Sequence, residues 1–415
     1  MEHETHAIEH ATTRCCIVGG GPAGIMLGYL LARAGVDIVV LEKHGDFLRD
    51  FRGDTVHPST LEVMYELGLI EGFLRRPHQE YPQVGARFGN LEAKIGDLSH
   101  LPTHCKFIAL MPQWDFLNYL TEQGRQFAGF FLRMQNEATD VIEENGRIVG
   151  VKGKTPSGSF EVRAQLTIGA DGRHSVIRKQ AGLQVEDLGT PIDVLWMRLP
   201  KQPGDADYTL GHLSTGKVLV TINRGDYWQC AFVISKGAFE QIQQRGLPAF
   251  RESIAEAAPF LHDRTSLLRD WNDIKLLSVR VDRLRTWSRP GLLCIGDSAH
   301  AMSPVGGVGI NLAIQDAVAA ANILAEPLRR DAVTPKHLQA VQQRRWSPTR
   351  LTQALQVQAH KRVLDPVLKG QVSFAKLPLV VRLFNDFPIL RRIPARLIGM
   401  GFRPEHVRTP AVRLY

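Results

Sequence analysis

The stretch CCIVGGGPAGIMLGYLLARAGVDIVVLE, at residues 15–42, decides the fold of this chain. Its opening CCIV is apolar enough for a buried strand, and residues 23–34 predict a helix because they contain no proline. VDIVVLE, at residues 36–42, predicts a second strand. A strand, a helix and another strand in this order form a β-α-β unit, in which the two strands lie parallel in one sheet.

Three glycines join the first strand to the helix in the pattern Gly19-x-Gly21-x-x-Gly24, and Glu42 ends the second strand. Gly19 makes the tight turn, Gly21 lets a pyrophosphate approach the backbone, and Gly24 lets the helix pack closely on the strand. The helix N-terminus favours the phosphate charge, and Glu42 can accept hydrogen bonds from a ribose diol. The pattern predicts a bound dinucleotide, but it does not choose between FAD and NAD.

The composition fits a globular protein with two packed domains. The 415 residues are 44% hydrophobic and 22% charged, which excludes a disordered, collagen-like or coiled-coil chain. Five cysteines without the spacing of a zinc site or a disulfide framework predict no metal and no structural disulfide. The start, MEHETHAIEHATTR, lacks the basic and apolar regions of a signal peptide, so we expect a cytoplasmic protein.

The net charge of +8 is concentrated near the C-terminus, because residues 369–415 contain nine Lys or Arg and two acids. An excess confined to this segment does not predict a nucleic-acid partner. Bulky apolar residues are mixed with the basic ones, a combination that also suits peripheral contact with an anionic membrane. The other interpretation is a pair of short helices packed on the body with a solvated basic face. The prolines in this tail keep its helices too short to span a membrane.

The order of elements predicts that one domain interrupts another. Residues 14–42 begin a nucleotide-binding domain, whereas PIDVLWMRL, GKVLVTINRG and DYWQCAFVIS, within residues 191–235, alternate like strands of an antiparallel sheet. Residues 311–362 return to long helices. We assign residues 1–76, 105–190 and 280–365 to the first domain, residues 77–104 and 191–279 to a substrate-binding β domain, and residues 366–415 to the tail. We expect a monomer or a homodimer.

Two later motifs follow further strands. LTIGADGRHSVIRKQAG, at residues 166–182, places Asp171 and Gly172 after a strand, and LLCIGDSAH, at residues 292–300, does the same with Gly296 and Asp297. A proline and the pattern Gly-Gly-x-Gly-x-Asn complete the second motif, at residues 304–311. Each aspartate could simply cap a turn. Together with the N-terminal glycines, however, the three motifs resemble the class A flavoprotein monooxygenases of the para-hydroxybenzoate hydroxylase type, over about residues 14–350.

The resemblance implies a glutathione-reductase-type Rossmann domain that binds FAD, with an inserted antiparallel β domain for the substrate and C-terminal helices. It assigns the FAD diphosphate and adenosine to Gly19, Gly21, Gly24, Glu42, Lys43 and Arg52. It assigns the ribityl chain and flavin ring to Gln113, Gly296, Asp297, Gly307, Gly309, Ile310 and Asn311. Asp171 would touch both FAD and a transient NADH or NADPH, and Pro304 and Gly309 would position substrate and flavin for catalysis. A helix N-terminus at residues 309–311 also suits the negative charge of a reduced flavin.

The activity that the resemblance implies is hydroxylation of an aromatic small molecule. NAD(P)H reduces FAD, O2 gives a flavin C4a-hydroperoxide, and its distal oxygen is transferred to the substrate. We find no arginine to hold a benzoate carboxylate, so phenolic or apolar substrates are expected. The main alternative on this fold is an FAD-dependent reductase or epoxidase of an isoprenoid or lipid. A halogenase would carry a Trp-x-Trp-x-Ile-Pro stretch, which the sequence lacks.

Six residues of the predicted β domain could face the substrate. Strand alternation turns about half of any such set away from a pocket. The candidates are Trp196, Arg198, Asn223, Tyr227, Trp228 and Phe232, of which we expect Trp228 and Phe232 to be core residues. His300, within LLCIGDSAH, is expected to be structural rather than an acid or base.

Overall fold

The computed structural model describes residues 8–48, 55–206 and 210–412. One sheet contains five parallel strands in the order β8-β2-β1-β11-β20. Their bounds are Phe130–Arg133, Ile38–Leu41, Glu9–Val18, Gly158–Gly169 and Leu292–Cys294. β19 (Ser288–Arg289) pairs with β20, and the antiparallel strands β10 (Arg147–Thr155) and β9 (Glu137–Glu144) extend from β11. The predicted β-α-β unit therefore forms the centre of a Rossmann-type sheet.

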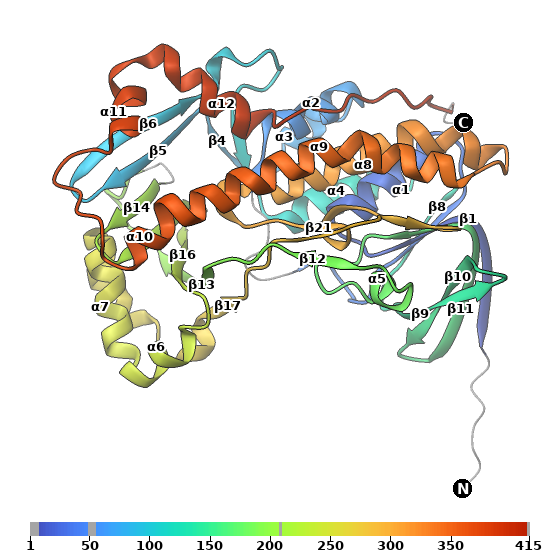
Figure 1. Cartoon of the computed structure of the whole chain (residues 1–415), viewed down its shortest axis with the longest axis horizontal. Helices are drawn as coiled ribbons and strands as arrows, with labels where there is room; N and C mark the ends of the chain where they lie inside the picture. The colour runs from blue at the N-terminus through green and yellow to red at the C-terminus, as the bar shows by residue number, and fades with distance from the viewer. Residues whose placement is uncertain (1–7, 49–54, 207–209, 413–415) are drawn as a thin grey trace, which may run out of the picture.

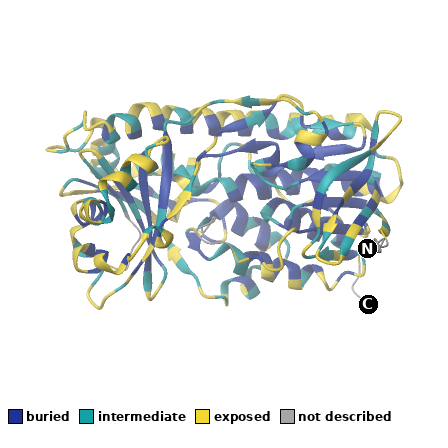
Figure 2. Cartoon of the chain, turned by 90° about the horizontal axis from the view of Figure 1, so that it is seen from below, coloured by how far each residue is buried: buried dark blue, intermediate teal, exposed yellow. Residues whose placement is uncertain are grey.

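Helices pack on the parallel sheet and on one another. α1 (Pro22–Arg33) contacts both α4 (Gln113–Gly124) and α8 (Gly309–Arg329), and α8 lies against α9 (Pro335–Ala359) (Figure 1). Every residue of α1 from Ala23 to Ala32 is buried, as expected for a helix that is apolar on all sides. Buried residues follow the inner helices and strands, and exposed residues follow the outer ones (Figure 2).

Among the described residues, one helical segment is long and apolar enough to cross a membrane. It is Val305–Arg329, whose most apolar window has a mean hydropathy of 1.4. In this fold 72% of that window is buried, and the helix packs between α1 and α9. The segment is thus placed as the central helix of the parallel-sheet half.

A seven-stranded sheet forms the other half, in the order β17-β13-β16-β15-β14-β5-β6. The bounds are Lys275–Leu277, Ile192–Pro200, Tyr227–Ser235, Lys217–Asn223, Leu210–Ser214, Gln83–Phe88 and Leu91–Asp97. The sheet is antiparallel except where β14 pairs in parallel with β5, a strand more than 100 residues earlier in the chain. α6 (Phe239–Arg245) and α7 (Leu247–Ala257) follow β16, and α7 packs beside β14 and β15.

Two small sheets complete the β structure. The first contains the strands β3 (Thr55–Val56), β7 (Ile108–Leu110) and β4 (Gln79–Tyr81), in that order. The second contains β12 (Val185–Asp187), β18 (Asp282–Leu284) and β21 (His300–Ala301). Before the C-terminal helices, the chain crosses between the two large halves at residues 77–82, 98–107, 188–191 and 278–281. The expected fold class, a Rossmann-type FAD-binding domain with an inserted substrate sheet, is confirmed.

The C-terminal tail has two parts. α9 continues as a π-helical turn, η6 (His360–Leu364), into α10 (Asp365–Leu368), and then α11 (Leu379–Asp386) and α12 (Arg392–Gly399) pack on β6. The chain then returns along the helices of the parallel-sheet half (Figure 1). There Arg33 donates to the carbonyl of Thr409 at 3.1 Å, and the Val412 N–H donates to the carbonyl of Arg33 at 2.8 Å.

Candidate active site

The predicted cofactor residues gather because four parallel strands end in one row. The strand ends that pair across this row are Val18, Leu41, Gly169 and Cys294. The glycine turn follows the first of them, Glu42 the second, Asp171 lies two residues after the third and Asp297 three residues after the fourth. Ligands of open α/β sheets bind at the carboxyl ends of the strands, so the topology brings the three motifs to one edge.

The glycine turn is shaped by close contacts between backbone atoms. Gly19 has φ of 110°, and a Cβ there would lie 2.3 Å from the carbonyl oxygen of Ala170. A Cβ on Gly24 would lie 1.9 Å from the carbonyl oxygen of Gly19. Gly21 differs, because a Cβ there would meet no atom of the described residues within 4 Å. The turn therefore has open space beside Gly21, at the N-terminus of α1, whose first turn contains no acidic residue. This arrangement fits a diphosphate.

Glu42 is 8% exposed and holds the glycine turn to the end of β2. Its carboxylate accepts hydrogen bonds from the N–H groups of Gly20 and His44, at 2.9 and 3.0 Å. Its expected contact with a ribose stays a prediction, as does the role of its neighbour Lys43, which is exposed. Arg52, the other residue expected to reach the diphosphate, lies outside the described residues.

Asp171 caps the start of α5 (Val176–Gln180). Its carboxylate accepts hydrogen bonds from the Ser175 hydroxyl at 2.5 Å and from the Ile177 N–H at 3.1 Å. Burial raises the pKa of Asp171 above its ordinary value, and these hydrogen bonds oppose that shift. The capping role that the sequence left open is therefore present in the structure, and contact of Asp171 with FAD or NAD(P)H stays a prediction.

Asp297 lies in a short turn, η4 (Gly296–Ser298), directly after β20. Its carboxylate is 3.8 Å from the guanidinium of Arg173, which belongs to the Asp171 turn. Arg178 binds the two turns together, because it donates to the carbonyls of Arg173 at 2.5 Å and Ser298 at 3.3 Å. Arg178 is itself buried and paired with Asp282. The two aspartate motifs thus form one connected unit.

The loop before α8 is built around two glycines with positive φ. Gly306 and Gly307 have φ of 81° and 63°, and a Cβ on Gly307 would lie 2.2 Å from Oγ1 of Thr55. The Thr55 hydroxyl donates to the Gly307 carbonyl at 3.0 Å. This contact fixes the loop against β3. Pro304, which begins the loop turn, is half-buried.

Asn311 joins the start of α8 to the segment 55–60. Its side-chain oxygen accepts from the His57 N–H at 2.9 Å and the Thr60 hydroxyl at 2.7 Å, and its amide donates to the carbonyls of Thr55 and Gly307. Because both polar atoms of the Asn311 side chain are already hydrogen-bonded within the protein, a contact between Asn311 and flavin would use the Asn311 backbone. The first i to i−4 bond of α8 runs from the Leu312 N–H to the Val308 carbonyl, so the N–H groups of residues 309–311 precede the helical ladder and are suited to bind an anion.

The comparisons with known proteins agree with this geometry. A family model described as FAD binding domain matches residues 12–355. The chain is 32% identical to the 6-methylpretetramide 4-monooxygenase of Streptomyces rimosus, over 98% of this chain and 97% of that protein. The chain belongs to the class A flavoprotein monooxygenases. Its relatives in this FAD-dependent family include monooxygenases of aromatic compounds.

Two further similarities show the breadth of this flavoprotein monooxygenase fold. The crystallised anhydrotetracycline hydroxylase of Streptomyces rimosus superposes with a TM-score of 0.73 at 21% identity, covering 95% of this chain and 77% of that one. The digeranylgeranylglycerophospholipid reductase of Methanocella arvoryzae is 25% identical over 78% of this chain and 80% of its own length. The first supports the fold alone, and the second shows that reductases share the sequence pattern.

Three side chains on one face of α9 and η6 hold the Pro304 loop of this monooxygenase, and the sequence did not reveal them. Gln353 donates to the Ala301 carbonyl at 3.2 Å. Gln356 accepts from the Ser303 N–H at 3.1 Å and donates to the carbonyls of Ser303 and Val305 at 2.9 Å. His360 lies 2.8 Å from the Ser303 hydroxyl. Their spacing of three and four residues along one helix was the available signal.

A buried ionic network lies behind the Asp297 turn and was also missed. Asp316, on α8, accepts from the Gly296 N–H at 3.0 Å, from His300 at 2.5 Å and from Arg345 at 3.0 Å. Arg345 also contacts Glu405 in the returning tail at 3.3 Å. Burial raises the pKa of Asp316, but His300 and Arg345 more than offset this and leave it below its ordinary value. His300 is 1% exposed, which agrees with a structural role.

The seven-stranded sheet divides the substrate candidates between its two faces. Trp228 and Phe232 pack against the helical side, with ring contacts to Phe260 and Phe250, as expected of core residues. Trp196 packs on the opposite side of the sheet. There it contacts one apolar cluster that includes Val305 of the Pro304 loop and a second cluster that includes residues of β7 and α12. Strand alternation places Arg198 and Tyr227 on that side too, and their side chains stack at 5.2 Å. Asn223 is buried and binds the following turn.

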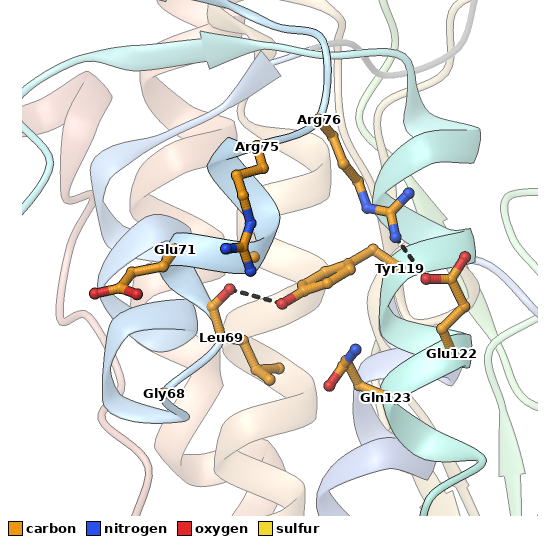
Figure 3. Close-up of a pocket in the computed structure, with 9 residues that line it drawn as sticks. Gly68, Leu69, Glu71, Arg75, Arg76, Tyr119, Glu122 and Gln123 are labelled. Carbon is orange, nitrogen blue, oxygen red and sulfur yellow. Dashed lines mark hydrogen bonds and ion pairs between the residues drawn. The ribbon is translucent and has the colours of Figure 1, made fainter.

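A surface cavity of about 480 Å³ lies between α3 (Ile70–Leu74) and the C-terminal half of α4 (Figure 3). Arg76 pairs with Glu122 at 2.5 Å across it, and the Tyr119 hydroxyl donates to the Leu69 carbonyl at 2.8 Å. None of the predicted cofactor residues that the structure describes lines this cavity. Gln113, the expected contact to the ribityl region, is the first residue of the same helix and lies at its other end.

Proposed function

We propose that this protein uses NADH or NADPH and O2 to hydroxylate a phenolic or apolar aromatic compound. The observation that carries the proposal is the meeting of the glycine turn, the two aspartate turns and the N-terminus of α8 at one sheet edge. A relative named for monooxygenation of 6-methylpretetramide, with which nearly the whole chain aligns, supports the aromatic substrate class. FAD, when bound, supplies the redox chemistry.

The residues of the chain would bind the cofactor along this edge. The open space at Gly21 and the N-terminus of α1 would receive the diphosphate, and Glu42 would bind the adenosine ribose. Asp297, close to Arg173, would bind the ribityl chain. The N–H groups of residues 309–311 would face the end of the flavin ring that becomes negatively charged on reduction, which stabilises the reduced state.

The aromatic substrate would lie between the Pro304 loop and the inner face of the seven-stranded sheet. Trp196 and its apolar neighbours offer a wall to a flat ring, and the Pro304 carbonyl can accept a hydrogen bond from a phenol. No second Gly-x-Gly-x-x-Gly pattern follows a strand in the sequence, so NAD(P)H is expected to bind only transiently, near Asp171.

The test uses the purified, FAD-loaded protein. NADH and NADPH oxidation is followed with a panel of phenols, fused-ring aromatics and isoprenoids, in air and without oxygen, with product identified by mass spectrometry. We expect oxygen uptake matched by product that has gained one oxygen atom. Turnover of an isoprenoid without oxygen would establish the reductase alternative, which the similarity to a lipid reductase favours. Protein that does not bind FAD would overturn the proposal.

A further inference from the structure

An apolar surface on the C-terminal helices lacks a partner in the described part of the chain. It is formed by α11, the turn η7 (Pro388–Arg391) and α12. Its exposed side chains are Leu379, Val380, Leu383, Phe387, Ile389, Ile393 and Leu397. Phe387 is 54% exposed and Ile389 is 67% exposed. Single exposed apolar residues are ordinary, but a group on adjacent short helices marks an interaction site.

The same helices are anchored by a second apolar face. Leu377 and Val381 pack against Phe88 and its neighbours on β5 and β6, and Ala395 and Ile398 pack into the cluster beside Leu98. A surface helix of a globular protein ordinarily has a polar outer face. α11 and α12 instead have apolar side chains on their inner and outer faces. The outer set therefore serves something other than folding of the described chain.

Positive charge borders this apolar surface. Residues 376–397 contain five basic residues and one acid. Lys376, Arg382, Arg392 and Arg396 are exposed, and the acid, Asp386, is paired with Arg382 at 3.3 Å. Basic and bulky apolar side chains on short helices match the interface of an anionic bilayer, where headgroups neutralise the charge and acyl chains receive the apolar groups.

A second copy of the chain fits this surface less well. A two-fold dimer would place the same patch against itself, which would bring the arginines of both copies together with only Asp386 to offset them. We propose that α11, η7 and α12 dock the protein peripherally on an anionic membrane surface. The short helices lie in the plane of the interface rather than across it. This inference does not depend on which substrate the enzyme hydroxylates.

The test is sedimentation of the full-length, FAD-loaded protein with vesicles. One set is phosphatidylcholine and the other an equal mixture of phosphatidylcholine and phosphatidylglycerol. We expect binding to the mixed vesicles that weakens at high salt. Phe387→Ser should weaken it by about tenfold, since one large apolar side chain no longer enters the interface. Phe131→Ser is the matched control, because Phe131 is also 54% exposed but lies on β8.

A second pair of variants tests the charge. Arg392→Glu with Arg396→Glu should abolish the preference for phosphatidylglycerol, whereas Lys154→Glu with Arg245→Glu changes the net charge equally at exposed sites elsewhere and should retain it. Bound flavin and circular dichroism show that each variant is folded. Lack of binding to either vesicle, equal binding by wild type and Phe387→Ser, or a dimer in sedimentation velocity that Phe387→Ser dissociates would overturn the proposal.

Discussion

The two ends of the candidate FAD site are built differently. The glycine turn at residues 19–24 owes its shape to backbone contacts within a short stretch and to the neighbouring strand end at Ala170. The loop at residues 301–308 is held by side chains from distant parts of the chain, among them Thr55 and Gln356. One end is encoded locally, and the other depends on tertiary support.

The two ends of the site should tolerate amino-acid substitution to different degrees. Backbone contacts at the diphosphate end allow no side chain at Gly19 or Gly24, because a Cβ at either position collides with main-chain atoms. The loop beside the reacting centre is held by hydrogen bonds from replaceable side chains. Its position can therefore shift by substitution on α9 while the diphosphate end of the site remains intact.

The largest effect is expected where the network behind the Asp297 turn is broken. Arg345→Met leaves Asp316 buried without its guanidinium partner, and loss of one member of a buried ion pair costs about 3–5 kcal/mol. Arg344→Met is the matched neighbour, because Arg344 also binds Glu405 but is more exposed, and its loss should cost about 1 kcal/mol. Urea unfolding measures both. Equal losses in the two variants would contradict the larger contribution assigned to the buried Arg345.

Gly24→Ala should destabilise the protein by about 3 kcal/mol, because the new Cβ would force α1 away from the turn. Gly21→Ala is the control within the same motif. Gly21 has φ of −77°, which alanine adopts freely, and among the described residues no atom lies within 4 Å of the place its Cβ would take. We expect Gly21→Ala to fold with wild-type stability but to bind FAD more weakly, since its methyl enters the space assigned to the diphosphate. Normal FAD affinity in Gly21→Ala would contradict that assignment.

The contrast between the two ends also explains what could be predicted from the sequence. Gly19, Gly24 and Glu42 form a pattern whose spacing follows from one turn, so the β-α-β unit and the FAD-binding family were predictable. Gln356 and His360 reach the Pro304 loop only because α9 packs across it. A glutamine that binds a backbone carbonyl has no sequence signature of its own. The parallel pairing of β14 with β5 likewise required knowledge of how distant segments meet.

Gln356→Met tests whether Gln356 positions the Pro304 loop at the flavin-ring end of the site, which is the reacting end. Each backbone group that loses its amide partner costs about 1–3 kcal/mol when buried. Gln342→Met is the control, since Gln342 lies on the same helix and binds backbone at Trp287 and Arg285 in the same two-sided way. We expect both variants to be less stable, but only Gln356→Met to divert NAD(P)H oxidation from hydroxylated product to hydrogen peroxide.

Measurement of product and peroxide together separates this idea from the proposed function. If neither variant changes the ratio of product to peroxide, the glutamine does not position the loop, although the enzyme is still a hydroxylase. If wild type forms no hydroxylated product with any aromatic compound, the proposed function is wrong and the stability effects remain. The two failures are therefore distinguishable.

The smallest expected effect is a pH dependence. Burial lowers the pKa of His57 from 6.5 to about 4, although its hydrogen bond to the Ile398 carbonyl opposes the shift. Between these values the unfolded chain binds a proton that the native His57 does not, so stability falls as the pH falls from 6.5 towards 4. From pH 7 to pH 5.5 this contributes about 1 kcal/mol, a part that His57→Gln should remove.

His212 provides the comparison in the other half of the molecule. Burial also lowers its pKa from 6.5 to about 4, with a further contribution from Arg87, and His212→Gln should flatten the stability profile similarly. The two variants should differ in the flavin spectrum, because His57→Gln removes the ring contact that segment 55–60 makes to the Ile398 carbonyl, and this segment also binds Asn311 at the start of α8. The His212 ring instead contacts Thr221 in the substrate sheet. A flavin spectrum that responds to His212→Gln but not to His57→Gln would mean that the reacting end is supported from the sheet rather than from segment 55–60.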